Sequence, residues 1–185
     1  MPDPHRLGNV GITPYDARWP DAYRAEEARL IELAERRFLH IEHFGSTAIP
    51  GLSAKPTIDI MAAVQSLESL TDVIPRLGAD GYRELSENFS YRRFFRKAAC
   101  EGCPSTHLHV VPEGAWPNKS ERFFRDWLIT HPERVEAYGR LKTTLATRFP
   151  DDRERYTEAK SEFIRGVVNE ARRSSGLEPL IDWTE

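Results

Sequence analysis

The stretch HFGSTAIPGLSAKPTIDIM, residues 43–61, contains the features that decide the fold. A Gly-Ser turn leads through a loop rich in proline and glycine into an apolar run that holds one acid, Asp59. Glycine lets a ligand approach the backbone closely, and the N–H groups and hydroxyl of such a turn can bind phosphate. The stretch is therefore either a phosphate-binding turn with a metal-binding carboxylate behind it or a loop between two strands.

Two well-known motifs do not fit this turn. Five residues separate Gly45 from Gly51, and no Lys-Ser or Lys-Thr follows Gly51, so the pattern is not a P-loop. Ser46 follows a glycine directly, which excludes the G-x-S-x-G nucleophile elbow. On spacing alone, such a run is more often a turn than a phosphate site. If it does bind phosphate, we predict that Gly45, Ser46 and Thr47 are the ligands.

The rest of the chain predicts an α/β (α+β) fold with a small mixed sheet, an N-terminal helix and a C-terminal helical part. Apolar and β-branched runs predict strands over 38–44, 57–64, 82–87, 91–98 and 106–111. Apolar periodicity predicts helices over 21–38, 66–81 and 120–131, one that starts at a capping box at 130–133, and a last one from 151. We predict one domain, 1–185, with a sheet part at 11–118 and a helical part at 119–175.

Composition limits the partners. Of the 185 residues 39% are hydrophobic and 30% charged, with a net charge of −3, so no global field attracts nucleic acid. No apolar run approaches the roughly 20 residues of a membrane span, and the first residues lack the features of a signal peptide. We expect a cytoplasmic protein with no membrane or nucleic-acid partner.

A strand, a Gly-Ser turn and an acid in the next strand resemble the nucleotidyltransferase superfamily, the fold of DNA polymerase β. The resemblance implies that Gly45 and Ser46 hold the phosphates of a nucleotide and that Asp59 holds magnesium. That superfamily usually has two acids one residue apart on the same side of the strand. Here Met61 occupies the second position, and a single carboxylate is a poor ligand set for two magnesium ions.

A narrower resemblance is to the GrpB family, a poorly characterised bacterial branch assigned to this fold. It extends from about Tyr15 to Ala171 and is carried by IEHFGSTAIPGLSAKPTIDI, RRFFRK, THLHV, FRDWLITHPERVEAYGRLKTTLA and YTEAKSEFI. Phe44 replaces a usually aliphatic residue, and TAIPG replaces the commoner TSVPG. The family also occurs fused to dephospho-CoA kinase, where it is described as an accessory or folding-assistance domain. The resemblance therefore implies the fold more directly than the function.

In THLHVV, His107 and His109 alternate along a strand and so point to the same side. Two other histidine patterns do not fit, because this sequence lacks the third histidine of the histidine-triad hydrolases and the second histidine motif of the cupins. In nucleotidyltransferase folds the third catalytic acid comes from a later strand that lies beside the strand of the first two acids. We expect His107 and His109 to occupy that position beside the Asp59 strand. With Asp59 and His43 they would form an oxygen/nitrogen site for a divalent metal, magnesium, manganese or zinc. Alternatively one histidine is a general base, or both are structural.

In YRRFFRK, Tyr91, Arg93, Phe95 and Lys97 share one face, while Arg92, Phe94 and Arg96 share the other. Because arginine binds phosphate oxygens bidentately, we predict Arg93 and Lys97 as an anion clamp. Lys55, before the Asp59 strand, is a further predicted phosphate ligand. The charged residues of YRRFFRK could equally be solvated side chains on an edge strand. Lys55 could likewise be an ordinary surface lysine.

Cys100 and Cys103 form a Cys-x-x-Cys pair in a turn. Such a pair can be redox-active or half of a zinc site with His107 and His109. An exposed loop with two thiols is the favoured interpretation.

Two functions remain open. The first is a metal-dependent nucleotidyltransferase-like enzyme that binds a nucleotide or another phosphorylated small molecule and transfers a nucleoside monophosphate. The second is a non-catalytic binding or accessory module that keeps the fold and associates with a protein partner. Met61 in place of the second acid means either that the histidines replace this acid or that the reaction is lost, and the sequence does not choose between the two.

Overall fold

The computed structural model describes residues 11–85 and 91–181. The chain divides into two compact units. The sheet unit comprises Asp16–Pro50 and Pro56–Lys119, and the helical unit comprises Met1–Tyr15, Gly51–Lys55 and Ser120–Glu185. Each unit is described below by itself.

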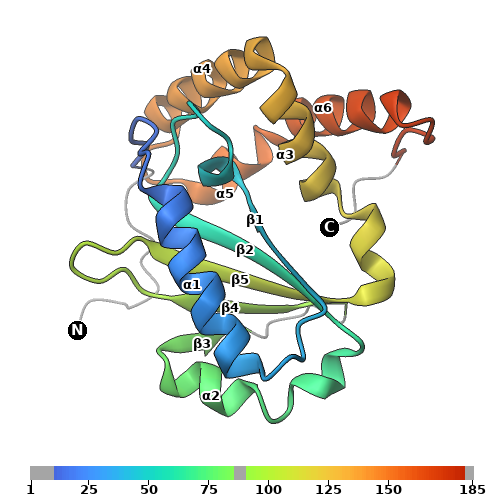
Figure 1. Cartoon of the computed structure of the whole chain (residues 1–185). Helices are drawn as coiled ribbons and strands as arrows, with labels where there is room; N and C mark the ends of the chain where they lie inside the picture. The colour runs from blue at the N-terminus through green and yellow to red at the C-terminus, as the bar shows by residue number, and fades with distance from the viewer. Residues whose placement is uncertain (1–10, 86–90, 182–185) are drawn as a thin grey trace. The chain divides into compact units, whose positions relative to one another are not determined.

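The sheet unit is built on a five-stranded sheet with the order β1-β2-β5-β4-β3 (Figure 1). The two central strands, β2 and β5, run parallel, and every other neighbouring pair is antiparallel. The long apolar run at 57–64 becomes the central β2, which explains why it shows little alternation. The strand bounds are β1 His40–Phe44, β2 Thr57–Val64, β3 Tyr82–Glu84, β4 Arg93–Lys97 and β5 Ser105–Pro112.

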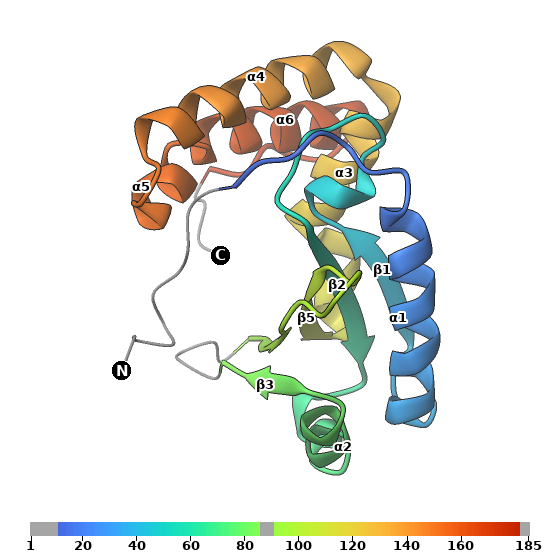
Figure 2. The same ribbon diagram turned by 90° about the vertical axis from the view of Figure 1, so that its left-hand side faces the viewer.

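The helices of this unit are shorter than predicted. Helix α1, Trp19–Ala34, lies along one face of the sheet (Figure 2) and ends where Glu35 and Arg36 adopt positive φ angles of 47° and 67°. The helix predicted over 66–81 is two pieces, η2 Leu67–Leu70 and α2 Ile74–Ala79. Two further 3-10 turns, η1 Ser46–Ala48 and η3 Glu113–Asn118, flank the sheet.

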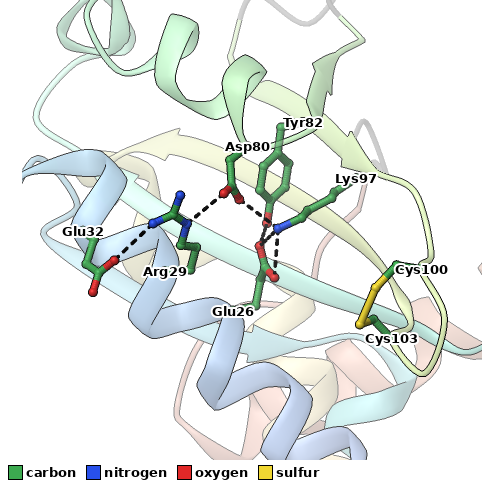
Figure 3. Close-up of polar contacts among 8 residues, drawn as sticks. All are labelled: Glu26, Arg29, Glu32, Asp80, Tyr82, Lys97, Cys100 and Cys103. Atoms are coloured by element: carbon green, nitrogen blue, oxygen red, sulfur yellow. Dashed lines mark hydrogen bonds and ion pairs between the residues drawn. A yellow bond between two sulfur atoms is a disulfide. The ribbon is translucent and has the colours of Figure 1, made fainter.

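A charged network holds α1 against the sheet (Figure 3). Glu26 on α1 accepts hydrogen bonds from the Tyr82 hydroxyl at 2.6 Å and from the Lys97 ammonium at 3.0 Å. Lys97 also donates to Asp80 at 2.8 Å, and Arg29 donates to the other oxygen of Asp80 at 2.8 Å. The ammonium of Lys97 is therefore part of the internal structure of this unit.

The network makes stability depend on pH through Asp80, whose side chain is 13% exposed. Burial alone raises the pKa of this carboxyl, but the hydrogen bonds from Lys97 and Arg29 outweigh it and hold the pKa below the usual 3.8. A depressed folded-state pKa stabilises the protein above the unfolded-state pKa and loses that effect as pH falls through the folded-state pKa.

We expect Asp80→Asn to lower the free energy of unfolding at pH 7 by roughly 1–2 kcal/mol. The difference from wild type should be complete well above the unfolded-state pKa of about 4 and should shrink as pH falls below it and through the lowered folded-state pKa. Urea unfolding of both proteins across this range measures the gap. A gap that does not shrink at all as the solution is acidified below about pH 4 to the lowest pH at which both proteins still fold would mean that the charge of Asp80 contributes nothing.

In the helical unit, α3 packs against α6, and the segment Gly51–Lys55 pairs with the described N-terminal residues through a bridge between Thr13 and Ala54. The Lys142 ammonium is buried and donates to the carbonyl of Ser53. The helices are α3 Ser120–Thr130, α4 Pro132–Arg148, α5 Arg153–Glu158 and α6 Ser161–Ser174.

Two details of this unit differ from the sequence predictions. The prediction of a capping box at 130–133 is wrong, because the Thr130 hydroxyl donates to the carbonyls of Asp126 and Trp127 instead of capping α4. The last helix begins near Asp152, whose carboxylate accepts from the Arg155 N–H, but it breaks into α5 and α6. No helix among the described residues is long and apolar enough to span a membrane, and the first ten residues and the end of the strand predicted over 82–87 lie outside them.

Candidate functional site

The parallel pairing of β2 and β5 brings Asp59 and His107 side by side. The Nδ1 atom of His107 lies 3.1 Å from Oδ1 of Asp59, within hydrogen-bond distance. Both side chains are partly exposed, 27% for Asp59 and 18% for His107. Two predicted site residues from distant parts of the sequence therefore lie in contact, and we use the name Asp59 pocket for these two side chains together with the Gly45–Ser46 turn.

The Gly-Ser turn lies directly against this carboxylate. Gly45 has φ 71° and ψ −172°, a conformation that only glycine adopts readily. A Cβ atom at this position would lie 2.3 Å from Oδ2 of Asp59, so no larger residue fits. Glycine here serves a close approach of backbone to carboxylate, and the partly exposed Ser46 follows it at the start of η1.

Thr47 does not take the role predicted for it. Its side chain is 1% exposed, and its hydroxyl donates to the carbonyl of Thr57 at 2.9 Å. The same oxygen lies 3.0 Å from Nε2 of His43. The prediction of Thr47 as a phosphate ligand is wrong, because its hydroxyl fastens the turn to the start of β2.

His43 is likewise not a ligand of the Asp59 pocket. In the register of β1 and β2, Phe44 lies opposite Asp59 and His43 opposite Ile60, so His43 points to the other face of the sheet. There its ring stacks on Tyr23 of α1 at 4.8 Å. The prediction of His43 as a metal ligand is therefore wrong, because its neighbour Phe44 is the residue of β1 on the same face as Asp59.

The two arginine-rich faces of β4 can now be assigned. Phe94 pairs with His109 and Arg96 with His107, so Arg92, Phe94 and Arg96 lie on the face of the Asp59 pocket. Arg93 points the other way and forms an ion pair with Glu84 at 2.6 Å. Lys97, on the face of Arg93, belongs to the network with α1 described above. The prediction of Arg93 and Lys97 as an anion clamp is wrong, and the alternative face carries the arginines near the site.

His109 lies deeper in the same face. Its ring packs against Phe94, with ring centroids 4.4 Å apart, and against the edge of Phe44 at 5.2 Å. Burial, followed by electrostatic repulsion from neighbouring basic residues, of which Arg92 acts most strongly, holds the pKa of His109 well below 6.5. The imidazole is therefore neutral at physiological pH.

The position of Met61 explains the missing second acid. Its side chain is 1% exposed and belongs to an apolar cluster that covers the neighbouring part of this face. An ionised carboxylate there would lose its hydration without a partner. The cluster consists of Phe44, Met61, Ala63, Val111 and Trp116.

Within the described residues, no group of three or more His, Cys, Asp or Glu side chains could hold a metal ion. The donors that the pocket does offer are Asp59 and His107. One or two protein ligands together with substrate phosphates and water are enough for magnesium in many phosphate-handling sites. The pocket thus fits a divalent ion that arrives with a nucleotide, and it does not fit a cage made of protein ligands alone.

Lys55 lies in the helical unit. Its ammonium is 5.6 Å from the centre of the Tyr156 ring, and that of Lys160 is 4.3 Å from the same ring. Both ammonium groups are therefore within cation–π distance of the same ring. The role of Lys55 in binding phosphate stays a prediction.

Cys100 and Cys103 are joined by a disulfide bond (Figure 3). Two backbone hydrogen bonds, of 3.2 and 3.0 Å, close the turn between them. Gly102, with φ 75°, allows this tight turn, and the Cα atoms of the pair lie 4.9 Å apart, within the range for a disulfide. The expectation of two free thiols is wrong, and bonded cysteines cannot serve as half of a zinc site.

A mixed five-stranded sheet, in which a Gly-Ser turn lies against an acid on the next strand, defines a nucleotidyltransferase-like fold. Among solved structures, the chain is similar to Cid1 poly(U) polymerase bound to MgATP, with a TM-score of 0.50 and 13% identity. The match covers 71% of this chain and 42% of that one. At this identity the likeness shows the fold alone.

The chain belongs to the GrpB family, because the model of that family, described as GrpB protein, matches residues 9–170. The crystal structure of the conserved protein GrpB from Enterococcus faecalis has a TM-score of 0.80 and 28% identity, and the match covers 90% of this chain and 99% of that one.

Relatives by sequence point the same way. The glutamate-rich protein GrpB of Alkalihalophilus pseudofirmus is 34% identical over 168 residues, covering 88% of this chain and 96% of that protein. UPF0157 protein YqkA of Bacillus subtilis is 32% identical over 165 residues, or 89% of this chain, but the match spans only 48% of that protein. A dephospho-CoA kinase of Mycolicibacterium paratuberculosis is 27% identical over 188 residues, covering 88% of this chain and 46% of that enzyme.

Proposed function

We propose that the Asp59 pocket binds a nucleotide together with a divalent ion and transfers a nucleoside monophosphate to an acceptor. The observation that carries the proposal is the close approach of the Gly45 backbone to Oδ2 of Asp59, with Nδ1 of His107 at 3.1 Å from Oδ1 of the same carboxylate. This places a turn able to bind phosphate next to a carboxylate able to bind a cation.

Each residue then has a chemical task. The backbone of the Gly45–Ser46 turn and the Ser46 hydroxyl bind phosphate oxygens, and Asp59 holds the cation. A bound divalent ion supplies charge neutralisation on the phosphates during in-line attack. With Nδ1–H donated to Asp59, His107 keeps a lone pair on Nε2, which can accept a proton or bind the cation.

The transfer step balances with these groups. The acceptor hydroxyl forms a bond to the α-phosphorus, and the bond from that phosphorus to the bridging oxygen breaks. Pyrophosphate leaves with the electron pair, while the hydroxyl proton passes to Nε2 of His107. Because His107 is already oriented by Asp59, this proton acceptor needs no rearrangement before the step.

Calorimetric titration of ATP in the presence of magnesium, manganese or zinc tests the binding. We expect Asp59→Asn, which keeps the shape and removes the charge, to weaken ion-dependent ATP binding by roughly tenfold or more. Asp72→Asn is the matched control, since Asp72 is an acid of the same unit with a side chain 65% exposed. Absence of binding with all three ions, or equal affinities in wild type and Asp59→Asn, would contradict the proposal.

A second candidate function is a non-catalytic binding or accessory module that keeps the fold without the transfer reaction. The burial of Met61 favours it, because the second acid of an ordinary transferase is absent. The similarity to part of a dephospho-CoA kinase agrees with such a role. Release of pyrophosphate from ATP separates the two functions: binding without any release, across a panel of hydroxyl-bearing acceptors, would support the accessory module.

A further inference from the structure

The turn that joins β4 to β5 holds the disulfide bond between Cys100 and Cys103 (Figure 3). Both cysteines are exposed, and so are the two residues between them. The two residues that precede Cys100 are alanines, also exposed, so no large side chain from this part of the turn covers the sulfur atoms. The bond is therefore accessible to a reagent in solution.

Contacts other than the disulfide hold the turn in shape. The N–H of Cys100 donates to the carbonyl of Cys103 at 3.2 Å, and the N–H of Cys103 donates to the carbonyl of Cys100 at 3.0 Å. Gly102 has a φ of 75°, a conformation that glycine adopts without steric cost. None of these contacts uses a sulfur atom. We therefore expect the turn to keep its conformation, with the two sulfur atoms close together, when the bond is opened.

The bond also closes a very small loop. A disulfide stabilises a protein mainly by restricting the unfolded chain, and this effect grows with the number of residues in the closed loop. Cys100 and Cys103 are three positions apart in the chain, so the restriction is small. Stabilisation of the fold is therefore a weak explanation for this bond, and its exposure fits a bond that is opened and closed again.

The surroundings of the sulfur atoms define the chemistry. A catalytic dithiol needs a thiolate that is stabilised by a helix N-terminus or a neighbouring cation. This pair lies between two strands, and the charged residue inside the turn is an acid, Glu101, which disfavours a thiolate. The carbonyl of Glu101 lies 3.7 Å from Sγ of Cys103 and can accept a hydrogen bond from the thiol of the reduced form. The pair is thus suited to be the target of a dithiol reductant and not to act as a catalyst.

We propose that Cys100 and Cys103 form a reversible redox site, which accepts two electrons from a dithiol reductant while the sheet unit stays folded. A thiolate of the reductant attacks one Sγ atom, forms a mixed disulfide and displaces the other cysteine as a thiolate. The second thiol of the reductant then breaks the mixed disulfide, so that the reductant itself becomes a disulfide. The two protons lost by the reductant pass to the cysteines, which become two thiols. The site is independent of the proposed function, because it uses no residue of the Asp59 pocket.

Mass spectrometry of the intact protein, after reaction with a maleimide in the absence of denaturant, tests the site. Purified without reductant, the protein should take up no maleimide. After incubation of the folded protein with dithiothreitol, both of its two cysteines should be labelled. Removal of dithiothreitol and treatment with oxidised glutathione should restore the unlabelled state. Reduction should leave the far-ultraviolet circular dichroism spectrum unchanged and lower the midpoint of urea unfolding by about 1 M at most.

Two variants separate a redox site from a bond that serves stability. Cys100→Ser/Cys103→Ser has no bond to open, and its midpoint of urea unfolding should equal that of reduced wild type. Gly102→Ala keeps both cysteines but strains the turn, although nothing lies within 4 Å of the added Cβ atom. It should re-form the bond with oxidised glutathione roughly fivefold more slowly than wild type.

Four results would each overturn the proposal. The first is maleimide uptake before reduction, and the second is reduction by dithiothreitol in urea-unfolded protein alone. The third is unfolding of the wild-type protein when it is reduced. The fourth is equal rates of bond formation in wild type and Gly102→Ala, since the turn would then not hold the two thiols together.

Discussion

Gly45→Ala is expected to lower the free energy of unfolding by roughly 2–4 kcal/mol and to weaken ion-dependent nucleotide binding. The backbone conformation at φ 71° and ψ −172° costs a non-glycine residue about 1–3 kcal/mol. The added methyl would also meet Oδ2 of Asp59 at 2.3 Å, and relieving such a clash costs typically about 1–3 kcal/mol. The carboxylate must move, so stability and binding should fall together.

Gly51→Ala is the control that isolates the clash. Gly51 also has a positive φ, 79°, but nothing lies within 4 Å of the position of a Cβ atom. Urea unfolding should therefore show a clearly smaller loss for Gly51→Ala than for Gly45→Ala, and ATP binding should change only in the latter. Equal losses would mean that the contact with Asp59 is unimportant.

Lys97→Met is expected to destabilise the protein by roughly 2–4 kcal/mol and to leave ion-dependent nucleotide binding unchanged. The side chain of Lys97 is 27% exposed, and its removal leaves the carboxylates of Glu26 and Asp80, 17% and 13% exposed, without their shared cation. Breaking a buried ion pair costs about 3–5 kcal/mol, and the partial exposure here reduces that figure.

Arg83→Met is the control for Lys97→Met, since Arg83 is an exposed cation on the neighbouring strand β3. It should change the midpoint of urea unfolding little. A Lys97→Met protein that is as stable as wild type but loses ion-dependent nucleotide binding would restore the sequence-based assignment of Lys97 as an anion ligand.

Much of the fold could be predicted because the strands have strong local signals. The β-branched run at 57–64 and the alternation in THLHVV gave strands close to β2 and β5. The resemblance to nucleotidyltransferases then implied that the acid of one strand and the histidines of the other are neighbours. The pairing of Asp59 with His107 agrees with that expectation.

The side of the sheet on which a residue lies could not be predicted in the same way. Alternation divides YRRFFRK into two sets of residues, but phenylalanine occurs in both, so hydrophobicity does not decide which set faces the site. The decision comes from the register of β4 on β5, where Arg96 meets His107. The error at His43 has the same origin, since a shift of one residue reverses the face.

Other errors came from contacts that only the folded chain makes. Thr47 follows the Gly-Ser pair and is therefore predicted from the sequence to bind phosphate. In the folded chain its hydroxyl instead contacts the carbonyl of Thr57 and the imidazole of His43. Met61 stands where a second acid is usual, and only the apolar cluster with Trp116 explains it. That the buried Nδ1 atom of His109 has no hydrogen-bond partner among the described residues could not be read from the sequence either.

The measurement that tests the central claim most directly is a crystal structure of this protein with a non-hydrolysable ATP analogue and a divalent ion. The account predicts phosphate oxygens within hydrogen-bond distance of the Gly45–Ser46 turn and an ion bound to the Asp59 carboxylate. Nucleotide bound elsewhere, with Asp59 contacting neither ion nor phosphate, would contradict it.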